Sequence, residues 1–194
     1  NTMVQNPAIS IEAVPIWNNI GAIGWIGFAP VFISYVLVFI DKRHFLKKAW
    51  YWLLVFGPVL HFWYLQVNGL LITDYTKMAF GWTYFWAEGI WPHIFYVYYI
   101  GLMLIGLSLM FWFVKKTDSP ARKKQAKLML ITSVIAAAIG SITNVLSQEF
   151  RIAVVPPLAD VAALIWAFGL VYAIVKYRFL GITTTAAAHN IIYT

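Results

Sequence analysis

The chain has 194 residues, of which 62% are hydrophobic and only 11% are charged. Ordinary soluble domains carry about 25% charged residues, so this composition excludes a water-soluble globular domain and indicates a chain solvated by lipid. Cysteine is absent, which excludes disulfides and cysteine-ligated metal sites. The formal net charge of +7 could suggest nucleic-acid binding, but the distribution of the basic residues explains it better.

Five runs are long and apolar enough to cross a hydrocarbon core of about 30 Å, which takes roughly 20 helical residues. They cover residues 17–40, 49–72, 94–114, 128–148 and 157–175. Pro30 and Pro58 fall inside the first two runs, where we expect kinks and not loops. No run alternates with period two and no internal repeat is visible. The sequence therefore predicts an all-α, polytopic bundle of transmembrane helices.

The basic residues predict the orientation of this bundle. If the five spans alternate in direction, twelve of the fourteen Lys and Arg residues lie on one side, and only Lys77 and Arg151 lie on the other. The twelve are Lys42, Arg43, Lys47, Lys48, Lys115, Lys116, Arg122, Lys123, Lys124, Lys127, Lys176 and Arg178. Because basic loops stay in the cytoplasm, we expect the amino end outside and the carboxyl end inside, in a multi-pass protein of the inner or plasma membrane. The charge is thus a topology signal, and no nucleic acid is expected as a partner.

These boundaries divide the chain into three parts. Residues 1–16 are predicted to be extracellular, and residues 17–180 form the transmembrane bundle. Residues 181–194 begin a cytoplasmic signalling helix or linker, with Thr183 to Thr185 as capping residues and Ala187, Ile191 and Ile192 as an apolar stripe. The alternative for this tail is a frayed segment along the headgroups.

The longest external segment, residues 73–93, is rich in aromatic residues. We expect a re-entrant or amphipathic stretch there. It either rests on the headgroups or acts as a lid over a ligand.

Polar residues inside a membrane are costly and suggest function, with packing roles as the competing account. Five of them fall in the outer half of the predicted spans and could line one pocket, with Glu88 and His93 at its mouth. The five are Gln66, Asn68, Asn144, Gln148 and Asp160. The alternative for the amides is an interhelical hydrogen bond, worth about 0.6 kcal/mol on average. An ionised Asp160 needs a partner or water at that depth, which favours function.

His61 lies near the middle of the second span. It is either a hydrogen-bonded structural histidine or one that responds to protons or contacts a ligand. No second histidine lies one helical turn away, so we expect neither a metal nor a cofactor. Catalytic motifs are missing as well, and no enzymatic activity is expected within these residues.

Small residues recur every four positions on the last two spans, which lets helix backbones approach closely. They are Ala159, Ala163 and Ala167 on the fifth span and Ser133, Ala137 and Ser141 on the fourth. Gly169 with Ala173, and Ala136 with Gly140, repeat the pattern on neighbouring faces. The pattern predicts a tight pair of the fourth and fifth spans, or a contact of one of them with a second protomer.

Several stretches, taken in order, resemble the amino-terminal seven-transmembrane sensor region of bacterial and archaeal histidine kinases. They are "NNIGAIGWIGFAPVFISYVLVF", "FGWTYFWAEG", "YVYYIGLMLIGLSLMFWFVKKTDSPARKKQAKLML", "SITNVL" and "PPLADVAALIWAFGLVYAIVKYRFLGITTTAAAHNII". The last is the most specific. The family has seven helices, so the resemblance implies that the first two are absent from this chain, and it also implies a cytoplasmic output and a homodimer.

The sequence therefore predicts a prokaryotic sensory module that passes an external or intramembrane stimulus to a histidine kinase, PAS or diguanylate cyclase output. A small or lipophilic ligand would shift the packing of the fourth and fifth spans. The alternatives are a transporter or channel subunit and a structural subunit of a larger membrane complex.

Overall fold

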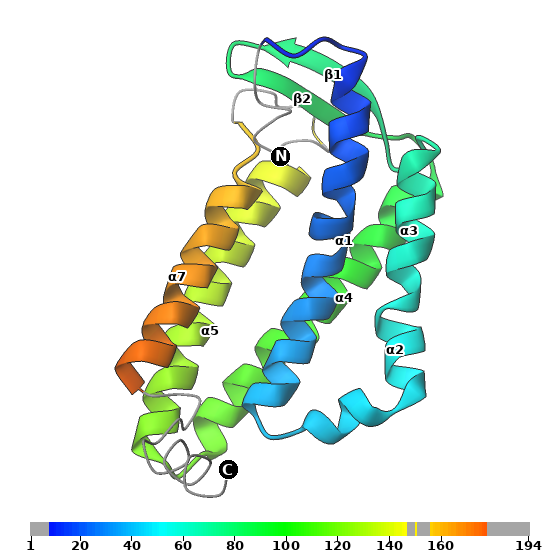
Figure 1. The fold of residues 1–194 in the computed structure, drawn as a ribbon. Coiled ribbons are helices and arrows are strands. Elements are labelled where there is room, and N and C mark those ends of the chain that lie inside the picture. The colour runs from blue at the N-terminus through cyan, green and yellow to red at the C-terminus, as the bar shows by residue number, and fades with distance from the viewer. Residues whose placement is uncertain (1–7, 147–149, 151–155, 178–194) are drawn as a thin grey trace, which may run out of the picture.

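The computed structural model describes residues 8–146, 150 and 156–177. Four long helices run along the molecule, with two shorter helices beside them and a hairpin across one end (Figure 1). The long helices are α1 (Ala13–Phe39), α4 (Ile90–Lys116), α5 (Pro120–Gly140) and α7 (Ala159–Tyr177). The shorter elements are the 3-10 helix η1 (Arg43–Lys47), α2 (Ala49–Val55), α3 (Gly57–Val67), the strands β1 (Ile72–Met78) and β2 (Gly81–Trp86), and the π-helix η2 (Ser141–Leu146), which continues α5.

Within this described part of the chain, three helices are long and apolar enough to cross a membrane. They are α1, α4 and the continuous α5–η2 segment, and α7 is a shorter apolar helix over Ala159–Ala173. The prediction of a mostly helical, apolar protein is confirmed. The predicted starts of several helices were late: α5 already begins at Pro120, because Ser119 Oγ accepts the Arg122 N–H at 3.4 Å and a proline suits the first helical turn.

In the second predicted span, 49–72, the kink expected at Pro58 takes the form of a break between α2 and α3, and the helix ends at Val67, before the predicted end at residue 72. The span is divided at Phe56, because Pro58 lacks an N–H and its ring disfavours a helix running through it. The chain then leaves the helix at Gly69, which has a φ of 70°. The N–H groups of Gly69 and Leu70 donate to the carbonyls of Gln66 and Leu65, at 3.0 and 2.9 Å, which is a Schellman ending. At Pro30, by contrast, α1 continues through the proline.

The predicted re-entrant or amphipathic stretch at 73–93 is instead mostly a β-hairpin. β1 and β2 pair antiparallel, with Met78 opposite Gly81, and the two residues between them form the turn. β2 is largely buried, and Trp82 Nε1 donates to the Ile9 carbonyl at 3.0 Å. Figure 1 shows the hairpin across one end of the helices. We call this the hairpin end, and the opposite end, with η1 and the α4–α5 connection, the basic end.

The interior and the exterior of the bundle are both apolar. A buried cluster toward the basic end joins α1, α4, α5 and α7 through residues such as Phe32, Met110, Met129 and Ala173. Large apolar side chains also cover the outside of the helices, where Leu60 and Val97 are 72% and 77% exposed. A surface of this kind suits a hydrocarbon solvent and not water.

The basic residues of the helical connections gather at the basic end. They belong to the α1–α2 connection, the end of α4, the first turns of α5 and the last turn of α7. Lys77, on β1, lies at the hairpin end (Figure 1).

The tail predicted to form a signalling helix, residues 181–194, lies outside the described residues. So do Gln148 and Arg151.

Candidate functional site

A cavity of about 460 Å³ lies between α1, α4, α5–η2 and α7, with β2 contributing to its wall. This volume is in the range of pockets that take small organic ligands. On α1 and α5 the wall includes Gly24 and Gly140, and a Cβ atom built on either would meet no neighbouring atom within 4 Å. The cavity therefore exists where small residues of the facing helices leave open space.

Most of the wall is aromatic. Trp25, Phe28, Phe32, Tyr84, Trp86, Phe95, Tyr96, Tyr99 and Trp166 all line it. The ring of Trp86 stacks on Phe95 at a centroid distance of 5.7 Å and meets the edge of Trp25 at 6.0 Å. The ring of Trp166, on α7, meets Phe28 of α1 at 5.6 Å. These edge and stacking contacts hold the rings in place, so the wall is preformed.

Asn144 is the polar centre of the hairpin end. Its Oδ1 accepts the N–H of Ala159 at 3.0 Å and the hydroxyl of Thr143 at 2.8 Å. Thr143 Oγ1 in turn accepts the Leu158 N–H at 3.2 Å. Two side chains of η2 thus satisfy N–H groups at the start of α7, which otherwise have no helical partner. Asn144 joins η2 to α7 and remains a candidate ligand-binding residue by prediction only.

The amide of Asn144 also reaches the hairpin. Its Nδ2 donates to the Tyr84 hydroxyl at 3.3 Å. Burial raises the pKa of Tyr84 to about 12, and the negative charge of Asp160 adds to this, against the opposing effect of the Asn144 hydrogen bond. The Tyr84 hydroxyl therefore stays protonated through the physiological pH range. β2, η2 and α7 meet at this point.

Asp160 lines the same cavity from the first turn of α7. A carboxylate is favoured there because the amino end of a helix carries a partial positive charge. Of the eight predicted ligand-binding residues, the structure places Asn144 and Asp160 together in this wall.

Gln66 belongs to a separate buried cluster between α1, α3 and β1. Its Nε2 donates to Asn19 Oδ1 at 3.0 Å, and Asn18 Nδ2 donates to the Tyr75 hydroxyl at 3.0 Å. Gln66 and Asn18 are almost fully buried. The single predicted pocket is thus divided, because the split of the second span and the hairpin place Gln66 away from α7.

The other predicted residues lie outside both clusters. Asn68 is exposed and donates to the Tyr64 carbonyl at 2.8 Å, and His93 is exposed beside the Gly89 carbonyl at 2.9 Å. Glu88 is exposed as well. His61 is exposed on α3, with its ring 5.3 Å from that of Trp91. Among the described residues no group of three potential metal ligands occurs.

The small residues that were predicted to pack helices together lie in two different places. Ala159, Ala163, Ser133, Ala137 and Ser141 line the cavity. Ala167 is half-buried on α7.

α5 and α7 also approach each other closely on a neighbouring face, at Gly169. A Cβ on Gly169 would lie 2.5 Å from Thr132 Cγ2. The helices pack side by side there, toward the basic end from the cavity.

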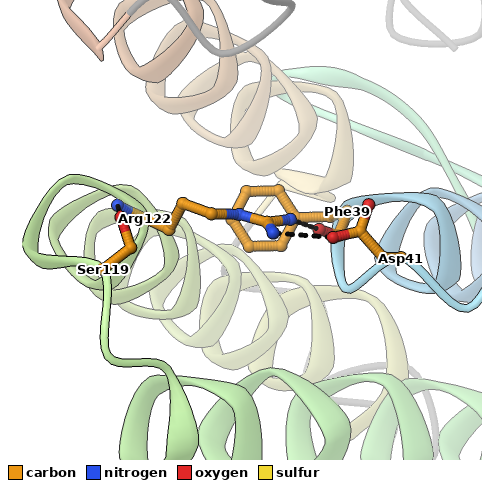
Figure 2. Close-up of polar contacts among 4 residues, drawn as sticks. All are labelled: Phe39, Asp41, Ser119 and Arg122. Atoms are coloured by element: carbon orange, nitrogen blue, oxygen red, sulfur yellow. Dashed lines mark hydrogen bonds and ion pairs between the residues drawn. The ribbon is translucent and has the colours of Figure 1, made fainter.

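At the basic end, Arg122 of α5 contacts the end of α1 (Figure 2), and it also contacts α4. It pairs with Asp41 at 2.6 Å and donates to the Phe39 carbonyl at 2.8 Å, both at the end of α1. Its guanidinium also lies 5.1 Å from the centre of the Phe113 ring on α4. We call these contacts the Arg122 clasp. Sequence reasoning treated Arg122 only as a topology marker.

Sequence reasoning also missed Tyr84, Trp86 and Trp166 as residues of the site. The signal for the first two was a short run of Thr, Tyr, Phe and Trp beginning at Gly81, which favours a strand. No local pattern marks Trp166, because its place in the wall depends on how α7 packs against α1.

The fold and the site define a helical bundle with an apolar exterior, of the kind that spans membranes, and an aromatic internal cavity. The chain belongs to the family described as the N-terminal 7TM region of histidine kinase, whose model matches residues 3–183. No match was found among the curated proteins or among the solved structures. Family membership confirms the resemblance to this sensor region and indicates a sensory module in a lipid environment.

Proposed function

We propose that the chain is a sensory module that detects a small or lipophilic ligand in the cavity and passes the signal to a cytoplasmic output domain. The observation that carries the proposal is that α7, the last helix among the described residues, supplies part of the cavity wall through Asp160, Ala163 and Trp166. A ligand that binds one arrangement of α7 better than another shifts the population of arrangements. Catalysis would belong to the output and not to these residues.

The proposed topology has five crossings, with α2 and α3 together as the second. The amino end and the hairpin face outside, and the basic end faces the cytoplasm, in a multi-pass protein of the inner membrane. The gathering of basic residues in the connections at one end supports this orientation. The homodimer that the family resemblance implied stays a prediction.

The topology can be tested without background labelling from this chain, because it has no cysteine. Single cysteines would be placed at Ala79, in the hairpin turn, and at Thr117, in the α4–α5 connection. A membrane-impermeant maleimide added to intact cells should label Ala79→Cys and spare Thr117→Cys until the membrane is opened. Labelling of both positions, or of Thr117→Cys alone, would overturn the orientation.

The signalling role can be tested by filling the cavity. Ala163→Leu adds volume in the wall, whereas Ala138→Leu adds the same volume on the exposed face of α5. A histidine-kinase core would be attached after residue 194, and its basal autophosphorylation measured in liposomes. Ala163→Leu should change basal output about fivefold or more, the usual scale of coupling between sites, and Ala138→Leu should not. Equal output from both variants and the parent would contradict the proposal.

A further inference from the structure

The connection between α1 and α2 is short and basic. Asp41, with a φ of 60°, turns the chain out of α1, and the Lys42 N–H donates to the Leu37 carbonyl at 2.8 Å. The connection then runs across the basic end to α2 (Figure 1). Within residues 42–48 it carries four exposed cations, which are Lys42, Arg43, Lys47 and Lys48.

These four cations have no anionic partner in the described part of the chain. The neighbouring carboxylate, Asp41, is already paired with Arg122 at 2.6 Å. The two lysines that end α4 differ, because their ammonium groups lie 4.4 and 4.9 Å from the centres of aromatic rings on their own helix. Cations that lie close together without a counter-charge repel one another, so the connection favours an anion from outside the chain.

Two exposed tryptophans adjoin these cations. Trp50 and Trp52, on α2, are 49% and 48% exposed. The Trp52 Nε1 donates to the Leu46 carbonyl at 2.7 Å, and the Trp50 ring lies 6.1 Å from the Phe45 ring in an edge contact. Both indoles are thus held against the connection. Tryptophan rings are enriched at the headgroup level of a membrane.

The side chains change character along α2. Lys48 precedes the helix, Trp50 and Trp52 come next, and Leu53 and Leu54 follow with still greater exposure. Six residues of helix advance about 9 Å. Over that length the surface passes from ammonium to indole to aliphatic groups, which is the order of the phosphate, interface and hydrocarbon layers of a bilayer. The cations of the connection therefore match the depth of lipid phosphates.

We propose that residues 42–54 form a binding surface for the headgroup of an anionic phospholipid. Its phosphate oxygens accept hydrogen bonds from the cations of residues 42–48, because Lys and Arg are the side chains that bind phosphate. Its apolar part packs beside the two tryptophans and the two leucines. A zwitterionic headgroup fits less well, since its own ammonium group is repelled by the four cations.

This surface is independent of the ligand cavity, with which it shares no residue. A free phosphate ion offers the same charge as a lipid phosphate. Only a lipid, however, also uses the exposed indoles and leucines that follow the cations, which favours the lipid as the occupant.

The test uses the whole chain, labelled with ¹⁵N at the tryptophan indoles, in phosphatidylcholine nanodiscs to which phosphatidylglycerol is added in steps. Trp50 and Trp52 report on the surface, and Trp50→Phe and Trp52→Phe assign their indole signals. The internal reference is Trp82 at the hairpin end, whose Nε1 donates to the Ile9 carbonyl at 3.0 Å.

The Trp50 and Trp52 signals should move with the fraction of phosphatidylglycerol and reach a plateau, while Trp82 should stay in place. Lys47→Gln combined with Lys48→Gln should raise the half-saturating fraction about fivefold or more, since each cation near an anionic surface contributes about fivefold. The matched control is Lys123→Gln combined with Lys124→Gln, which removes two exposed charges from the same end but on α5. It should raise the half-saturating fraction by about twofold at most.

Equal effects of the two double variants would overturn the proposal, because the attraction would then belong to the charge of the whole end. Movement of Trp82 together with Trp50 and Trp52 would also overturn it, as a response of the entire protein to the bilayer.

A last arm separates the lipid from a free anion. Inorganic phosphate, added to phosphatidylcholine nanodiscs, should leave the Trp50 and Trp52 signals in place. A saturable shift with phosphate alone would overturn the assignment to a lipid. Because lipid binding and not output is measured, a failure of this proposal leaves the proposed function unaffected.

Discussion

Glycines toward the two ends of the bundle have opposite surroundings. Nearer the basic end, a Cβ on Gly106 would lie 2.6 Å from Phe32 Cε1, and one on Gly169 would lie 2.5 Å from Thr132 Cγ2. Nearer the hairpin end, Gly24 and Gly140 have open space at the same position. Glycine therefore brings helices into contact in the half near the basic end and leaves room for a ligand in the half near the hairpin end. The close-packed half resists change, and the open half is where a ligand can act.

The strongest way to break this comparison is to add one methyl group to the α5–α7 contact. Gly169→Ala should destabilise the protein by about 2–3 kcal/mol, because Thr132 Cβ, only 2.8 Å from the new atom, cannot move without its helix. Gly140→Ala should be neutral or stabilising by up to about 1 kcal/mol. Denaturant unfolding in mixed micelles would measure both. A Gly169→Ala protein as stable as Gly140→Ala would show that the two halves do not differ.

Two glycines on α4, one of them at the contact with α1, provide a second comparison. Gly106→Ala should cost about 1–2 kcal/mol, because the Phe32 ring is fully buried and has little room to turn away. Gly101→Ala, on the same helix, meets nothing within 4 Å and should not destabilise. The thermal unfolding midpoints of both variants in lipid nanodiscs would test this. Equal midpoints for the two variants would show that Gly106 and Phe32 are not in tight contact.

Removing the Arg122 clasp should have a smaller effect. Arg122→Ala should cost about 1 kcal/mol, because the Asp41 pair is partly exposed and such pairs contribute little, while the bond to the Phe39 carbonyl contributes more. Lys123→Ala is the matched loss of a neighbouring exposed charge and should have no effect. The cost should shrink at high salt if the ion pair dominates. If the free energy of unfolding is unchanged by Arg122→Ala, the clasp does not stabilise the protein.

The pH dependence of stability tests the hairpin end of the comparison. The pKa of Tyr84 is raised to about 12 by burial, so the unfolded state loses this proton first, near pH 10. The stability that Tyr84 contributes is therefore fully present below pH 10 and is lost between pH 10 and about 12. Tyr84→Phe should change stability at pH 7 by about 1 kcal/mol or less and should flatten the loss above pH 10. A decline in stability that is identical in the variant would assign it to other tyrosines.

Four of the five predicted spans correspond to apolar helices, because length and hydropathy are properties of the local sequence. The second span differs in that its helix is broken at Phe56 and ends at Val67, and the local signals for both features were given too little weight. Asn68-Gly69 marks a helix ending, and Gly57-Pro58 marks a helix start. The hairpin was missed because its buried strand, "GWTYFW", does not alternate.

The site was less predictable than the fold. Asn144 and Asp160 stood out because polar residues in an apolar run are conspicuous, and both line the cavity. Trp86 and Trp166 were hidden among the ten tryptophans of the chain. Whether an indole N–H finds a partner depends on the tertiary packing around it, which no local pattern encodes.

The Arg122 clasp fixes one end of α5, so that the helix can tilt about this point. Arg122 ties the start of α5 to α1 and α4, whereas Asn144 lies about 33 Å further along α5–η2, counted at the rise of a helix. Spreading the cavity by about 2 Å at that distance would tilt α5 by only about 3°. Ala173 of α7 packs in the same cluster as Ala126 and Met129, which lie within two turns of Arg122 along α5. The end of α7 would therefore hardly be displaced, and an output domain joined to it would have to read a change in the direction of the helix.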